Sequence, residues 1–99
     1  MNRKDKSIEI LKKEVESIEI DEVYITKKIS VSDIDPENSD NNIIIDGEIE
    51  IYAHYEDDEF RFSQAGWVIN SASFSGWMYI CDEDCKPVSS EELIILNII

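Results

Sequence analysis

The chain has 99 residues, with 23 Asp and Glu against nine Lys and Arg, and a formal net charge of −14 at pH 7. This length provides one domain with a single core, and the 42% of hydrophobic residues exceeds what a disordered acidic chain carries. The scarcity of cations argues against direct binding of nucleic acid, and the absence of a long apolar run argues against a membrane-spanning segment.

The charge is concentrated in one part of the chain. Residues 1–28 hold seven basic and seven acidic groups, whereas residues 29–99 hold two basic groups against sixteen acids. Because like charges repel one another, we expect salt or a cationic partner to stabilise the fold. Residues 1–13 alternate charged residues with isolated apolar ones and lack the apolar run of a secretory signal, so we expect a cytoplasmic protein.

Residues 4–18 are predicted to form a helix. Ile8, Leu11, Val15 and Ile18 recur at helical spacing and define a narrow apolar stripe. Asp5 or Ser7 is a candidate for the N-cap. A narrow stripe is typical of a helix that lies on a sheet.

From residue 22 the hydrophobic period changes to two, which predicts a strand, and residues 33–42 have the Asp, Asn, Ser and Pro content of a loop. The next strand is the clearest in the chain. Its predicted inward residues are Ile43, Ile45, Ile49, Ile51, Ala53 and Tyr55, and its predicted outward residues are Asp46, Glu48, Glu50, Tyr52 and His54.

Two further strands are predicted, at residues 60–69 and 74–81, with turns at residues 56–59 and 70–73. A bulge is predicted near residues 64–66, where the inward phase of the pattern changes. At the C-terminus, Ser89 followed by Glu92 fits a capping box and predicts a short helix from Ser90. The alternative is a fifth strand at Leu93–Ile99, a tail so apolar that it must be buried or contact another chain. The predicted fold class is therefore α+β, with an N-terminal helix on a twisted antiparallel sheet of four to five strands and a short C-terminal helix or strand.

No motif predicts a catalytic residue, a metal site or a cofactor. His54 is the one imidazole and stands on a predicted polar face. Cys81 and Cys85 lack the second ligand pair that a zinc site needs, and the acids between them disfavour a reactive thiolate.

The candidate site is the polar face of the second strand. Because same-face residues of a strand are about 6.8 Å apart, its acids form a regular row of carboxylates. The turn at residues 56–59 is expected to extend the row, and the loop acids Asp33, Asp35, Glu37 and Asp40 are candidates for its other end. The predicted partner-binding residues are Asp46, Glu48, Glu50, Tyr52, Glu56, Asp57, Asp58 and Glu59.

A regular row of negative charge imitates the phosphates of DNA, which carry one charge per about 1.7 Å of duplex axis. In size, charge and lack of a catalytic motif, the chain is similar to nuclease immunity proteins, anti-restriction and anti-CRISPR proteins, and DNA mimics. We therefore expect a non-enzymatic inhibitor that binds a basic nuclease or other nucleic-acid-binding protein. Two alternatives remain: an assembly subunit that dimerises through the tail Leu93–Ile99, and a small enzyme that uses Asp46 or Glu48 with His54.

Overall fold

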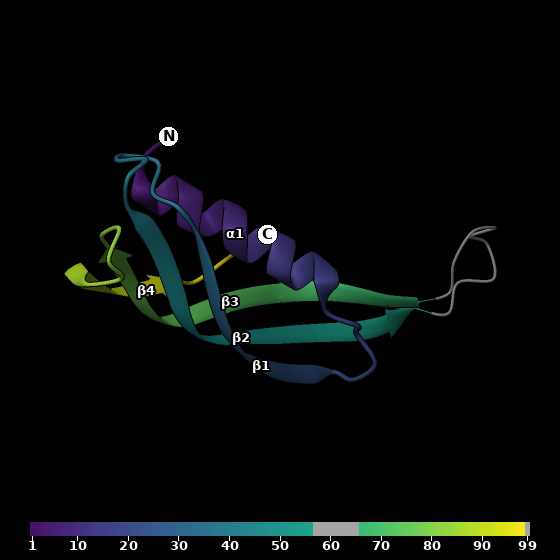
Figure 1. The fold of residues 1–99 in the computed structure, drawn as a ribbon. Coiled ribbons are helices and arrows are strands. Elements are labelled where there is room, and N and C mark those ends of the chain that lie inside the picture. The colour runs from purple at the N-terminus through teal and green to yellow at the C-terminus, as the bar shows by residue number, and fades with distance from the viewer. Residues whose placement is uncertain (57–65, 99) are drawn as a thin grey trace.

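The structure, a computed structural model, describes residues 1–56 and 66–98. It has one helix and four strands, which are α1 (Arg3–Ser17), β1 (Tyr24–Ile34), β2 (Asn42–Glu56), β3 (Gly66–Cys81) and β4 (Pro87–Ile95). The strands form one antiparallel sheet in the order β1-β2-β3-β4, and α1 packs against one of its faces (Figure 1). The predicted α+β class and the N-terminal helix on an antiparallel sheet are confirmed.

Helix α1 begins one turn earlier than the candidate caps. Asn2 is the N-cap, and its side chain accepts a hydrogen bond of 2.8 Å from the backbone N–H of Asp5. Leu11 and Val15 of the predicted stripe are buried, whereas its end members Ile8 and Ile18 are only partly buried. The buried face also includes Ser7 and Ile10, so it is wider than the predicted stripe.

The core lies between α1 and the inward face of the sheet. The four predicted inward isoleucines of β2 are almost completely buried, and each contributes about 1.5–3 kcal/mol by leaving water. Strand β3 adds four buried side chains, and β4 adds two. The core members on the sheet are Ile29, Ile43, Ile45, Ile49, Ile51, Ala72, Phe74, Met78, Ile80, Leu93 and Ile95.

Two glycines face each other where β2 and β3 pair at the centre of the sheet. The ring of Phe74 covers both Gly47 and Gly76. A Cβ at Gly47 would overlap the backbone oxygen of Ser75 and would lie 2.7 Å from Phe74 Cζ. Glycine is therefore needed at Gly47 because the ring and the neighbouring backbone occupy the space that a side chain would take.

The predicted turn at residues 70–73 is wrong, because β3 runs without interruption through this segment. The serines that suggested a turn alternate with Ala72 and Phe74, which are buried, so the segment follows the period of a strand. The register shifts between Tyr52 and Ala53 of β2, where Asn70 has no opposite residue. On the two sides of this bulge, opposite sets of alternating residues of β3 face the core. The bulge predicted near residues 64–66 lies largely outside the described residues.

The predicted helix from Ser90 is also wrong. Residues 87–95 form β4, which pairs along β3 with Ser89 opposite Ile80 and Glu92 opposite Trp77. The alternative of a C-terminal strand is correct in type, although this strand is the fourth and begins at Pro87. Beyond it the backbone N–H of Ile98 donates a hydrogen bond of 2.7 Å to the Ala72 carbonyl, and the Ile98 side chain is buried.

The molecule is elongated. Its radius of gyration is 16.1 Å, larger than the value of about 13 Å typical of a compact chain of this length. The longest dimension is 54 Å, which agrees with the length of β2 and β3 at about 3.3 Å per residue. Within residues 1–56 and 66–98, no helix is long and apolar enough to cross a membrane.

Candidate protein-binding face

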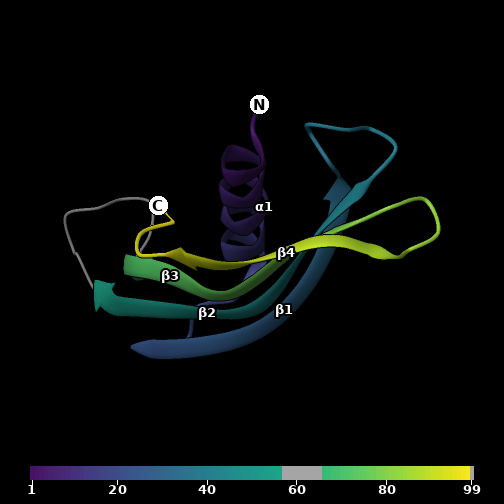
Figure 2. The same ribbon diagram turned by 90° about the vertical axis from the view of Figure 1, so that its left-hand side faces the viewer.

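Helix α1 covers the concave side of the sheet, and the opposite face carries no covering element in the described part of the chain (Figure 2). Asp46, Glu48, Glu50 and Tyr52 lie on this uncovered face, because they alternate with the buried isoleucines of β2. The predicted outward orientation of these four residues is therefore correct. Their same-face spacing of about 6.8 Å follows from the strand geometry.

The strand pairings give each acid a neighbour on both sides. On β1, Thr26 lies opposite Glu50 and Lys28 lies opposite Glu48. Among the described residues of β1 to β4, Lys28 is the one Lys or Arg on the uncovered face, which also carries the imidazole of His54. The structure shows no ion pair between Lys28 and Glu48. The acids of β2 thus dominate the charge of this face.

Three exposed aromatic rings flank the acids. The rings of Tyr24 and Tyr52 lie 4.9 Å apart between centroids, and the Tyr24 hydroxyl donates a hydrogen bond of 3.1 Å to Glu50 Oε1. This hydrogen bond to a carboxylate raises the pKa of Tyr24. Trp77 lies opposite Asp46 and is 45% exposed. Exposed Tyr and Trp side chains are typical anchors of protein–protein interfaces.

The small residues of β3 leave a hollow beside the acids. Ser73 lies opposite Glu50, and Ser75 lies between Glu48 on β2 and Ile94 on β4. The hollow has a volume of about 210 Å³, and its lining consists of Glu48, Glu50, Ser73, Phe74, Ser75, Ile94, Ile95 and Leu96. The hollow could not be predicted from the sequence, because it depends on the register that aligns Ser75 with Glu48 of β2 and Ile94 of β4.

The far end of the row contains a histidine as well as an acid. His54 Nε2 lies 2.9 Å from Glu56 Oε1, and its Nδ1 contacts the side-chain oxygen of Asn70. The contact with Glu56 and, to a lesser degree, that with Asn70 raise the pKa of His54. Asp57, Asp58 and Glu59, which we predicted as further partner-binding residues, lie outside the described residues.

His54 and the carboxylates named for an enzyme do not share a site. His54 lies six positions beyond Glu48 along β2, a distance of about 20 Å at the rise of a strand. The nearest carboxylate to the imidazole in the described hydrogen bonds is that of Glu56.

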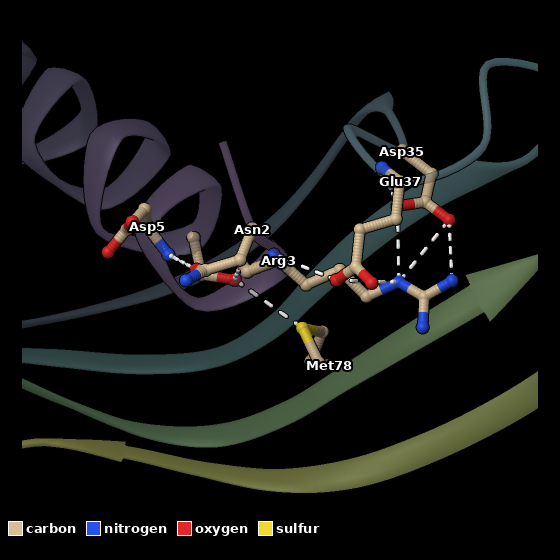
Figure 3. A network of polar contacts seen from close by, with 7 residues as sticks. Asn2, Arg3, Asp5, Asp35, Glu37 and Met78 are labelled. Atoms are coloured by element: carbon tan, nitrogen blue, oxygen red, sulfur yellow. Dashed lines mark hydrogen bonds and ion pairs between the residues drawn. The ribbon is translucent and has the colours of Figure 1, made fainter.

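Three of the four loop acids do not extend the row, because cations of α1 bind them. Arg3 forms a double contact with Asp35, in which Nη2 lies 2.8 Å from Oδ2 and Nε lies 3.1 Å from Oδ1 (Figure 3). The backbone N–H of Arg3 also donates to Glu37, and Lys6 Nζ lies 3.0 Å from Asp33 Oδ2. The Asp35 side chain is completely buried, and the hydrogen bond from Arg3 holds its pKa below the usual value. These acids attach the start of α1 to the end of β1 and to the β1–β2 loop.

The fourth loop acid belongs to a different acidic patch. Asp40 lies with Asp82, Glu83 and Asp84 of the β3–β4 turn around a shallow depression of about 340 Å³. In this turn, Asp82 Oδ1 accepts hydrogen bonds of 2.9 Å from the backbone N–H groups of Asp84 and Lys86. Two hairpins about 40 residues apart in the chain meet here because they connect neighbouring strands at the same end of the sheet.

Both cysteines of this region are free thiols: Cys81, at the end of β3, is buried, and Cys85, within the β3–β4 turn, is exposed. Within the residues described, no three or more His, Cys, Asp or Glu side chains are arranged to hold a metal ion.

Comparison with known proteins does not identify a relative: no protein family, no curated protein and no solved structure matches this chain.

Proposed function

We propose that this protein is a non-enzymatic acidic inhibitor, which binds the basic groove of a nucleic-acid-handling protein through the uncovered face of its sheet. The observation that supports this proposal is the combination of carboxylates and exposed aromatic rings on one uncovered face. Asp46, Glu48 and Glu50 stand in a row there, and Tyr24, Tyr52 and Trp77 flank them.

The charge pattern supports a basic partner. The carboxylates of β2 repeat at about 6.8 Å, so several of them can meet the Lys and Arg side chains that a protein arranges along a phosphate backbone. Arg3 and Lys6 of α1 bind Asp35 and Asp33 away from this face, so these two cations do not offset its acids. The acids of the uncovered face therefore remain available for a cationic partner.

The aromatic rings supply binding free energy that the charges alone do not. Exposed ion pairs contribute only about 0.2–1 kcal/mol each, because water and salt screen them. Buried Tyr and Trp side chains at the centre of an interface contribute more, often 2 kcal/mol or above. A row of acids beside Tyr52 and Trp77 thus combines fast, charge-driven encounter with anchors that slow dissociation.

Capture of partners from a lysate of the source cell, with matched variants, tests this proposal. Glu48→Lys with Glu50→Lys should abolish capture of a basic protein at low salt while the fold stays intact, because both side chains point away from the core. The control is Glu83→Lys with Asp84→Lys, which changes the net charge by the same amount at the β3–β4 turn and should retain capture. Ile49→Asp places a charge in the core and should unfold the protein.

Two results contradict the proposal. One is capture that is equally strong for the Glu48 and Glu50 variant and for the wild type. The other is loss of capture in the Glu83 and Asp84 variant alone, which would place the interface at the acidic turn.

A second candidate function, an assembly subunit that forms a homo-oligomer, is favoured by the side chains of β4 and its extension. Ile94 is 57% exposed and Leu96 is 83% exposed, although Leu93, Ile95 and Ile98 are buried within the domain. Sedimentation of the isolated protein distinguishes the two: a dimer that Leu96→Ser dissociates supports the subunit, and a monomer supports the inhibitor.

A further inference from the structure

The hollow on the uncovered face has walls of two different kinds. Glu48 and Glu50 of β2 form one wall, and Ile94 and Leu96 form the other. Ser73 and Ser75 of β3 lie between the walls, opposite Glu50 and Glu48 respectively in the strand pairing. Because serine is shorter than its neighbours, the hollow follows β3. We call this site the serine furrow.

The groups of the serine furrow are available to a ligand. In the part of the chain that the structure describes, the Ser73 and Ser75 hydroxyls make no side-chain hydrogen bond, and Glu48 forms no ion pair. Glu50 accepts one hydrogen bond, from Tyr24, at a single carboxylate oxygen. A carboxylate offers about four acceptor positions, so both acids can accept further donors.

The size of the furrow indicates what it can hold. Sites for small molecules commonly measure about 300–1,000 Å³, whereas the furrow measures about 210 Å³. This is the scale of one long side chain. The carboxylates require a cationic head group, and the aliphatic wall favours a long apolar stem beside it.

We infer that the serine furrow receives an arginine side chain of the basic partner, an inference that rests on the proposed function. The guanidinium lies between Glu48 and Glu50 and donates to their carboxylates and to the serine hydroxyls, while its methylene stem packs on Ile94 and Leu96. Arginine fits better than lysine because its planar head has five donors in a fixed fork and is less strongly hydrated than an ammonium group.

The acidic turn provides an internal comparison. The depression there is lined by Asp40, Asp82, Glu83 and Asp84 together with Asn38 and Asn41, so it is acidic but has no aliphatic wall. If charge alone governed binding, a cationic ligand would prefer the acidic turn, which has four carboxylates against two in the furrow. If the inference holds, an arginine ligand selects the furrow.

The test is an NMR titration of the isotope-labelled protein with the capped tripeptide acetyl-Gly-Arg-Gly-amide, and separately with its lysine counterpart, at low salt. The arginine peptide should shift the amide signals of Ser73, Ser75, Ile94 and Leu96, with little change at residues 82–84. It should also bind several times more tightly than the lysine peptide. Equal shifts at both acidic sites, or equal affinity for the two peptides, would overturn the inference.

Two pairs of variants separate the walls of the furrow. Glu48→Gln with Glu50→Gln should weaken binding of the arginine peptide by about fivefold or more, since two charge pairs are lost. Glu83→Gln with Asp84→Asn makes the same change of charge and should leave binding unaltered. Leu96→Ser should weaken binding without a change in charge, and Val88→Ser, a control at an exposed position of β4 outside the furrow, should not.

The dispersion of the amide spectrum shows whether each variant is folded. If the peptide fails to select the furrow while capture of the partner still depends on Glu48 and Glu50, the arginine furrow is overturned and the proposed function stands.

Discussion

The contact between Arg3 and Asp35 should be the most important polar interaction for the stability of this fold. Arg3→Met removes the guanidinium and leaves a completely buried carboxylate, to which the structure then gives one donor, the backbone N–H of Glu37 at 3.0 Å. A buried carboxylate that loses its cation is costly because the protein around it cannot replace its hydration.

The size of the effect follows from the exposure of the two partners. Removing one member of a fully buried ion pair costs about 3–5 kcal/mol. The Arg3 side chain is 32% exposed, so water already screens part of the attraction, and a lower range of about 2–3 kcal/mol is appropriate. For a domain of this length, that corresponds to a fall in Tm of roughly 10–20 °C.

The loss of unfolding free energy in Arg3→Met should depend on pH in a defined direction. Because Arg3 lowers the pKa of Asp35 in the folded state, its stabilisation is fully present above the unfolded pKa of about 3.9. It is lost as the pH falls through the lower, folded pKa. The difference in unfolding free energy between wild type and Arg3→Met should therefore be complete at pH 7 and should shrink progressively below about pH 4.

Urea denaturation at pH 7 and at pH 3 measures both effects. Lys4→Met is the matched control, since it removes the same charge from the same helical turn at an exposed position with no ion pair among the described residues. A loss below about 0.5 kcal/mol for Arg3→Met, or a loss that does not shrink in acid, would refute the buried contact.

Three further predictions concern charge, packing and protonation. The Tm should rise between about 10 and 200 mM salt, because screening relieves the repulsion among the acids; a flat or falling Tm would contradict this. Gly47→Ala should cost about 1–3 kcal/mol in denaturant titration, because the new methyl group meets Phe74 and backbone. Gly66→Ala, which has open space around the new Cβ, is its control. NMR titration of His54 should give a pKa above 6.5 that Glu56→Gln lowers; the contact then stabilises the fold below pH 6.5, and this stabilisation is lost as the pH rises through the folded pKa.

The sequence predicted the fold correctly in those segments whose local residue preferences agree with the tertiary structure. From Ile45 to Ile51, β2 alternates isoleucine or glycine with acids, so the two faces of this segment were clear from the sequence. In β3, the polar composition of residues 70–73 predicted a turn, although apolar and polar residues alternate through this segment. One strand was therefore predicted as two. In β4, Ser89 and Glu92 fit a helix cap locally, but pairing with β3 decides the structure.

The candidate site was predictable only within a single strand. The row Asp46, Glu48 and Glu50 follows from the period of β2 alone. The serine furrow requires the register that places Ser75 between Glu48 and Ile94, and no local pattern specifies this register. The loop acids were misplaced for the same reason: the binding of Asp35 by Arg3 depends on how α1 lies on the sheet.

Association kinetics with the captured partner test the acidic interface most directly. The rate constant for association should fall steeply as ionic strength rises, and Glu48→Lys with Glu50→Lys should lower it by about tenfold or more at low salt. Glu83→Lys with Asp84→Lys, with the same net charge, should have a much smaller effect. An association rate for the Glu48 and Glu50 variant that stays within about twofold of wild type at every salt concentration would contradict the proposal that this face meets the partner.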